Sequence, residues 1–315
     1  MDELMRLHPN GLFLRREALD LGYRDKDLLE ARRASVIERV RHGAYVPTST
    51  WLARDDIERY RLRGQAVCLS HEGGRVALSH TSGAAEHGLR LWGVNTEHVH
   101  VVRLDGAAGR RQRDVVYHED SWTPDDIYAK DELLVLGAEE CALGAASLTS
   151  AESGVAIMDS LLDLDLGTEE SVWAAYGRRR LWPRHAKVQI MLRLRRRGAQ
   201  SIGESRTRHG MFVDHLPEPR LQYVVRDHLG IVVGITDFAW PAYRLLGEFD
   251  GMIKYGRLLK PGQTAGDAVE KEKMREDRLR EVTGWGMIRF VWADLYNRRV
   301  TGDRVRRMMR MNRVA

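Results

Sequence analysis

The sequence has little cysteine and no long apolar run. Only two cysteines occur in 315 residues, Cys68 and Cys141. Both fall in apolar patterns typical of helices, so neither a disulfide framework nor a cysteine-based zinc site is expected. No apolar run reaches the roughly 20 residues that cross a membrane, and the N-terminus lacks the apolar core of a signal peptide. We therefore expect a protein of the reducing cytoplasm with no membrane partner.

The sequence also lacks a strong excess of either charge. It has 50 Lys and Arg against 45 Asp and Glu, and the net charge of +5 by itself indicates no partner. The distribution is more informative, because most of the basic residues are arginines and several are clustered. Arginine suits bidentate contacts with phosphates. The length is enough for two or three domains, each with its own core.

Residues 1–50 are expected to form a DNA-binding domain. Apolar spacing predicts a helix over 12–21 and a second helix from Asp25. Two short strands are expected within 36–46, around His42-Gly43. Helix, helix and hairpin is the order of a winged helix-turn-helix, whose second helix enters the major groove; a small helical cap with solvated arginines is the alternative. The nucleic-acid-binding residues predicted here are Arg32, Arg33, Arg39 and Arg41.

Residues 51–177 are expected to form a mixed α/β middle domain. Helical and strand patterns alternate there, with helices expected at 55–69, 82–91, 139–146 and 151–162, and strands at 98–103 and 115–118. His98 and His100 could share a strand face and bind a metal. Because no third ligand lies nearby in the sequence, a solvated face is the expectation.

The strongest charge feature is the segment 178–200, expected to be a basic linker helix. Its first twenty residues contain no acid, while Val188, Met191 and Leu192 recur at helical spacing. The missing acids favour a surface that faces phosphates over an ordinary solvated helix face, with an acidic protein partner as another possibility. The nucleic-acid-binding residues predicted here are Arg178, Arg179, Arg180, Arg184 and Lys187.

Acidic residues stand out in residues 201–315, where the patterns predict the order α-β-β-β-α-β. Glu204 lies on the first helix, Asp237 closes an apolar strand, and Glu248 and Asp250 lie two apart on the next strand. Residues two apart in a strand point to the same face. If these two strands pair, three carboxylates come together, which is costly unless a cation binds them.

Several short strings in this region resemble a known group of nucleases. The strings are Thr236-Asp-Phe-Ala-Trp-Pro241, Glu248-Phe-Asp-Gly251, Asp277-Arg-Leu-Arg280 and Gly284-Trp285. With Glu204, they resemble the core of the PD-(D/E)xK nuclease superfamily over residues 200–296, and more narrowly the domains related to very short patch repair endonucleases. The N-terminal half resembles the winged-helix region of AbiEi-type antitoxins, on Arg39 to Val46 and on Ser79-His80 and Tyr117-His118.

The nuclease resemblance implies a metal site and a set of catalytic residues. Mg²⁺ or Mn²⁺ would be held by Asp237, Glu248 and Asp250, and Glu204 would act through a water molecule. The catalytic set would be Glu204, Asp237, Glu248 and Lys254. Many members of the superfamily have a lysine where this chain has Asp250. Lys254 would take its electrostatic role, or else Lys271 or Lys273.

Each acid also has a structural interpretation. Glu204 suits the N-terminal end of a helix, Asp250-Gly251 is a turn dipeptide, and Asp237 could be a hydrogen-bonded aspartate within the core. Two functions therefore stay open. One is a metal-dependent endonuclease acting on double-stranded DNA. The other is a non-catalytic, antitoxin-like repressor with a degenerate nuclease-like domain and a toxin or other protein as partner.

The expected fold class is thus α/β and α+β, in several domains. The order is a winged helix-turn-helix, the mixed α/β middle region, the linker helix and a restriction-endonuclease-like αβββαβ core.

Overall fold

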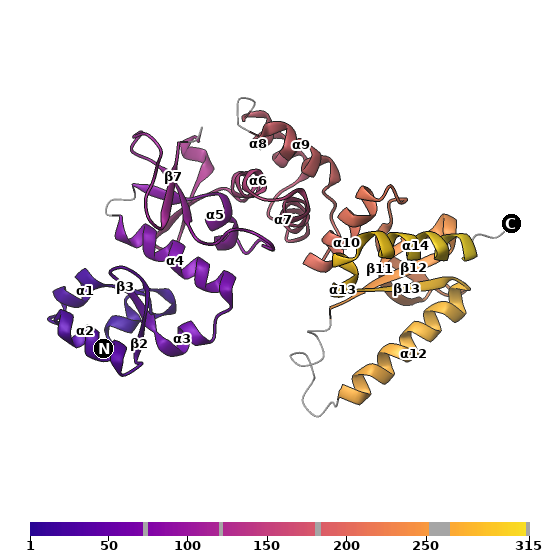
Figure 1. The fold of residues 1–315 in the computed structure, drawn as a ribbon, viewed down its shortest axis with the longest axis horizontal. Coiled ribbons are helices and arrows are strands. Elements are labelled where there is room, and N and C mark those ends of the chain that lie inside the picture. The colour runs from indigo at the N-terminus through magenta and orange to yellow at the C-terminus, as the bar shows by residue number, and fades with distance from the viewer. Residues whose placement is uncertain (72–74, 120–121, 180–183, 252–264, 313–315) are drawn as a thin grey trace. The chain divides into compact units, whose positions relative to one another are not determined.

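The described residues form a mixed α/β structure with three sheets (Figure 1), which confirms the predicted mixed character. The computed structural model describes residues 1–71, 75–119, 122–179, 184–251 and 265–312, with the backbone alone for 265–272. The chain divides into two compact units. Unit 1 comprises Met1–Ile157 with Leu164–Met191, and unit 2 comprises Met158–Asp163 with Leu192–Ala315. In the described part of the chain, no helix is both long and apolar enough to span a membrane.

The first part of unit 1 is a small sheet with short helices. Its strands are β1 (Phe13–Leu14), β2 (Ile37–Arg41) and β3 (Ala44–Pro47), in the antiparallel order β1-β3-β2. The accompanying helices are η1 (Leu4–Arg6), η2 (Pro9–Gly11), α1 (Arg15–Asp20), α2 (Asp25–Arg33) and α3 (Thr48–Leu52). The helix expected over 12–21 is shorter, because Phe13 and Leu14 pair with Tyr45 and Ala44 of β3.

The hairpin turn and a compact core hold this part together. Gly43 joins β2 to β3 with φ at +76°, a conformation that glycine adopts without steric cost. Phe13, Leu28 and Ile37 are fully or nearly fully buried and pack against one another. The position of α2 is therefore fixed by its apolar face, and its polar face stays open to solvent.

The rest of unit 1 is built on a six-stranded sheet of order β6-β7-β5-β4-β9-β8. The strands are β4 (Val76–Leu78), β5 (Val99–Arg103), β6 (Arg110–Arg111), β7 (Val115–His118), β8 (Ile127–Lys130) and β9 (Leu133–Leu136). The helices that lie wholly in unit 1 are α4 (Asp56–Ser70), α5 (His80–Glu86), η3 (Pro124–Asp126), α6 (Ala138–Leu148) and α8 (Glu169–Gly177). Two further helices, α7 (Ala151–Asp163) and α9 (His185–Leu194), begin in unit 1 and end in unit 2. The helix expected at 82–91 begins earlier, at His80, and ends at Glu86.

Unit 2 contains a four-stranded sheet of order β10-β11-β12-β13. The strands are β10 (Arg220–Arg226), β11 (Val232–Trp240), β12 (Leu245–Asp250) and β13 (Gly286–Val291). The first three form an antiparallel meander, and β13 pairs in parallel with β12 after the crossover through α12 (Ala265–Thr283). The remaining elements are α10 (Ile202–Val213), η4 (Pro241–Tyr243), α13 (Trp292–Tyr296) and α14 (Arg298–Asn312).

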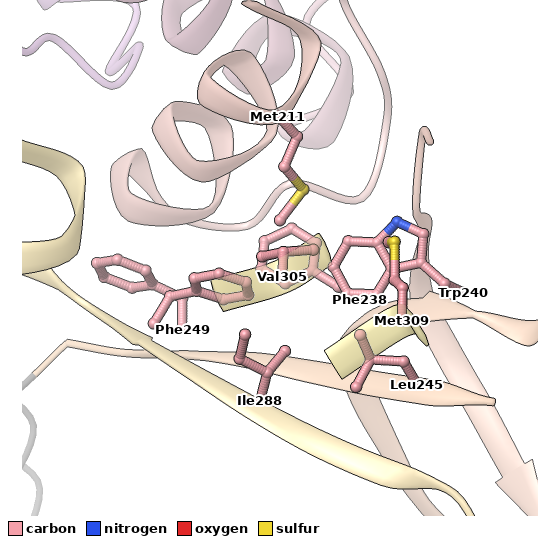
Figure 2. Close-up of a cluster of buried hydrophobic side chains, with 9 residues drawn as sticks. Met211, Phe238, Trp240, Leu245, Phe249, Ile288, Val305 and Met309 are labelled. Carbon is pink, nitrogen blue, oxygen red and sulfur yellow. The ribbon is translucent and has the colours of Figure 1, made fainter. Parts of the chain in front are cut away.

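Helices cover both faces of this sheet (Figure 1). On one face, Met211 of α10 and Val305 and Met309 of α14 pack against Phe238 and Ile288 (Figure 2). On the other face, Leu279 of α12 packs against Ala239 and Leu246. The sheet is therefore the middle layer of three, and α10 and β12 approach each other closely.

We predict that Gly203→Ala destabilises unit 2, whereas Gly210→Ala in the same helix does not. A Cβ at Gly203 would clash with the ring of Phe249, while one at Gly210 meets only Arg298, at 3.6 Å. Overpacking of this kind costs about 1–3 kcal/mol, and an alanine without a clash adds up to about 1 kcal/mol of helix stability. Urea denaturation of both variants measures the difference, and equal midpoints would contradict the contact.

Candidate functional site

Asp237 and Glu248 lie at adjacent positions of neighbouring strands. The antiparallel register pairs Phe238 with Gly247, and Asp237 and Glu248 are the next residues beyond that pair. At that position the Asp237 side chain, and not a backbone carbonyl, binds the neighbouring strand: its Oδ2 accepts a hydrogen bond of 2.8 Å from the amide of Phe249. This end of the β11–β12 pair therefore carries two carboxylates side by side in the register.

Two arginines neutralise the acids on β12. Glu248 is 8% exposed and forms an ion pair with Arg275 of α12. Arg289, the register partner of Glu248 in β13, lies 3.9 Å from Glu248 and 3.8 Å from Asp250, and 2.7 Å from Glu276. A buried carboxylate requires such a partner. The site is therefore a mixed cluster of acids and arginines.

Glu204 lies at the start of α10 and has a different role from that of Asp237 and Glu248. Its Oε2 accepts a hydrogen bond of 2.8 Å from the amide of Gln200, and its Oε1 accepts one of 2.7 Å from the Ser201 hydroxyl. The Ser201 hydroxyl in turn accepts a hydrogen bond from the amide of Glu204. Ser201 thus caps α10, and the Glu204 carboxylate holds the cap and the residue before it. Glu204 thus fills the structural role that the sequence left open for it.

The donors at Asp237, Glu248 and Asp250 fit a hard divalent cation in type, since Mg²⁺ and Mn²⁺ prefer carboxylate oxygens. Such a cation would lower the pKa of a bound water and offset charge on a phosphate. Within the residues that the structure describes, no group of three or more His, Cys, Asp or Glu is arranged to hold a metal. The ion pair with Arg275 occupies the Glu248 carboxylate, one of the groups that a cation would use. Lys254 lies outside the described residues.

Three of the predicted nucleic-acid-binding arginines project from the surface of unit 1. Arg33 at the end of α2 and Arg39 in β2 are exposed, and Arg32 is half-buried. None of the three guanidinium groups has a hydrogen-bond or ion-pair partner among the described residues. They are available to phosphates.

The other predicted basic residues contact protein groups. Arg41 forms a two-pronged contact with Asp114, at 3.0 and 3.3 Å. Arg178 and the buried Arg179 both pair with Glu140. Arg184 and Lys187 donate to the carbonyls of Ser147 and Thr149, and burial next to Arg184 lowers the pKa of Lys187. Arg180 lies outside the described residues.

Unit 1 also contains a trio of histidines, His80, His100 and His118, that periodicity did not reveal. The rings of His80 and His118 stack at 3.7 Å between centroids, and His100 Nδ1 lies 2.8 Å from His118 Nε2. The three come from α5, β5 and β7, so only the topology brings them together. The strand spacing of His98 and His100 was visible in the sequence, but His98 instead contacts Arg111.

The surroundings of the trio favour neutral imidazoles. Burial, and then the nearby His118, lowers the pKa of His100 to about 3. Burial also holds the pKa of His80 well below its usual range. A single shared proton suffices for the contact between His100 and His118, whereas two protonated rings at this distance would repel.

We predict that unit 1 loses stability on acidification below pH 6.5, the ordinary histidine value, and down to about 3. Over this window the unfolded chain binds a proton at His100 and the folded chain does not, so the free energy of unfolding falls as the pH falls. One proton contributes a slope of up to about 1.4 kcal/mol per pH unit. Urea melts between pH 7 and 4 should give a shallower slope for His100→Gln; parallel profiles would contradict the assignment.

Known proteins do not assign the chain to a family. No family model matches it, and no curated protein matches it.

Proposed function

We propose that this protein binds double-stranded DNA through the first part of unit 1 and hydrolyses phosphodiester bonds with Mg²⁺ or Mn²⁺ at Asp237 and Glu248 in unit 2. One observation supports the catalytic part above all. The two carboxylates occupy adjacent register positions, where the Asp237 side chain replaces the backbone ladder. The surrounding α-β-β-β-α-β order agrees with the resemblance to PD-(D/E)xK nucleases.

The basic hairpin supports the DNA-binding part. α1 and α2 precede the β2–β3 hairpin, and β1 adds a third strand to it, which agrees with a winged helix-turn-helix. In that arrangement α2 would present Arg32 and Arg33 to the duplex, and the hairpin would present Arg39. These are the predicted basic residues whose guanidinium groups have no protein partner in the described structure.

Arg275 would provide the positive charge that a lysine provides in many members of the superfamily. A cation bound at Glu248 would compete with Arg275 for the same carboxylate. Once released, the guanidinium of Arg275 would lie beside the metal site and could bind the phosphate to be cleaved. Arginine suits this role, because its donors match two phosphate oxygens at once.

The second candidate is a non-catalytic repressor, and a specific observation favours it. Glu248 is already paired with Arg275, and Glu204 is committed to the cap of α10. A site of this kind is stable without a metal. A fold does not guarantee the chemistry of its relatives. In this case unit 2 would provide a surface for a toxin or another protein partner.

For DNA binding, we predict that Arg33→Ala and Arg39→Ala each weaken affinity for duplexes of any sequence. Each change should reduce the slope of log affinity against log salt by about 1, as expected for one lost phosphate contact. Arg54→Ala is the matched control, because Glu58 lies 3.0 Å from Arg54 and already neutralises it. Fluorescence anisotropy at several salt concentrations measures the slopes. Unchanged slopes in both variants would rule out this surface.

For catalysis, we predict that the wild-type protein nicks supercoiled plasmid in the presence of Mg²⁺ or Mn²⁺. Asp237→Asn should slow nicking by roughly two orders of magnitude or more, because one electrostatic contribution to the transition state is removed. Asp303→Asn, an exposed carboxylate on α14, is the control. DNA affinity should be the same in all three proteins.

The same experiment separates the two candidates. Nicking by wild type and by Asp303→Asn, but not by Asp237→Asn, supports the nuclease. If none of the three nicks DNA under any of the metal conditions while all three bind it, the repressor is the better description.

A further inference from the structure

A pocket in unit 2 lies beside α10 and plays no part in the proposed nuclease site. It has a volume of about 280 Å³, and its polar lining comes from Arg193, Arg196, Arg208 and Glu218. Met211 and Phe212 of α10 contribute its apolar side. Pockets that bind small molecules typically combine such an apolar wall with a few polar groups.

The charges of the pocket are only partly compensated. Arg196 pairs with Glu218 at 2.9 Å, and Arg208 pairs with the buried Asp159 at 2.6 Å. The guanidinium of Arg193 has no such partner among the residues that the structure describes, so the lining retains a positive charge. An anion is therefore the charge type that this pocket favours.

Arg208, which lines the pocket, has one buried nitrogen without a hydrogen-bond partner in the described structure. The side chain is 4% exposed, and the nitrogen is its Nε. A buried donor of this kind requires an acceptor, because leaving it unsatisfied costs about 1–3 kcal/mol. The other nitrogens of Arg208 are occupied by Asp159 and by the Leu194 carbonyl.

The apolar wall of the pocket indicates that the ligand contains a flat ring. Phe212 is 52% exposed although it is a large aromatic residue on a well-packed helix. An exposed aromatic face next to arginines is the arrangement on which nucleobases stack in proteins that bind single strands. Glu218, on the same pocket, can accept a hydrogen bond from the amino group of a base.

We propose that the pocket binds one nucleoside monophosphate unit, with its phosphate at the arginines and its base on Phe212. The unit could be a free nucleotide or a nucleotide of a DNA strand, since both present the same phosphate and base. This pocket is distinct from the carboxylates of β11 and β12, and binding to it does not depend on hydrolysis at that site.

The test uses the full-length protein and dAMP as the probe. Saturation-transfer NMR should show contact with the adenine protons, and calorimetry should give an affinity at least roughly tenfold above that of deoxyadenosine, as expected when charged hydrogen bonds are lost. Phe212→Ala and Arg193→Ala should each weaken dAMP binding by roughly tenfold. Arg310→Ala, an exposed arginine on α14, is the matched control and should bind as wild type does.

Several results would overturn the proposal. These are no dAMP binding, inorganic phosphate binding as tightly as dAMP, or full affinity in Phe212→Ala with an unchanged melting temperature. A short oligo-dA strand distinguishes the two sources: displacement of dAMP that is lost in Phe212→Ala indicates a nucleotide of a strand, and dAMP that stays bound indicates a free nucleotide. Asp237→Asn should keep its dAMP affinity, so a failure of the nuclease proposal remains distinguishable.

Discussion

Asp159 and Arg208 form an ion pair that is almost entirely removed from water, with 0% and 4% of the two residues exposed. Arg208 donates to both carboxylate oxygens, at 2.6 and 2.8 Å, and the amide of Arg196 donates to one of them at 2.8 Å. An isolated charge could not be buried in this way, and removing one partner of such a pair costs about 3–5 kcal/mol. The pair therefore fixes α10 to the end of α7, and the amide of Arg196 ties the segment before α10 to the same carboxylate.

Three features of unit 2 depend on where α10 is held. Its first turn contains Glu204 with its hydrogen bonds to Gln200 and Ser201, its apolar face places Met211 in the core of Figure 2, and the neighbouring Phe212 lines the pocket. A rotation of the helix would disturb all three together. The close approach of Gly203 to Phe249 limits such a rotation, because no side chain fits between them.

The sequence could predict elements with a local signature and could not predict contacts between distant segments. The α-β-β-β-α-β order from Ser201 onward followed from apolar alternation and turn residues. β4 and β9 were missed, because each is a short apolar run that becomes a strand only through its partners. α14 is rich in arginine, yet Val305 and Met309 place one face of it in the core.

The same limit applies to the candidate site. The spacing of Asp237 and Glu248 is local, and the register of β11 with β12 places the two residues opposite each other. The pairing of Glu248 with Arg275 joins residues on separate elements, and long arginine side chains have many rotamers, so no periodicity indicates their partners. The histidine trio is likewise assembled from three elements by the order of the strands.

The contact between Arg41 and Asp114 has a consequence for the β2–β3 hairpin. Arg41 also donates to the Ser70 hydroxyl at 3.0 Å, so the hairpin is tied at once to the end of α4 and to the residue before β7. The hairpin is thus preorganised. Because the hairpin is already ordered on folding, a ligand that binds it causes little further loss of conformational entropy. A larger share of the free energy of each new contact therefore contributes to affinity.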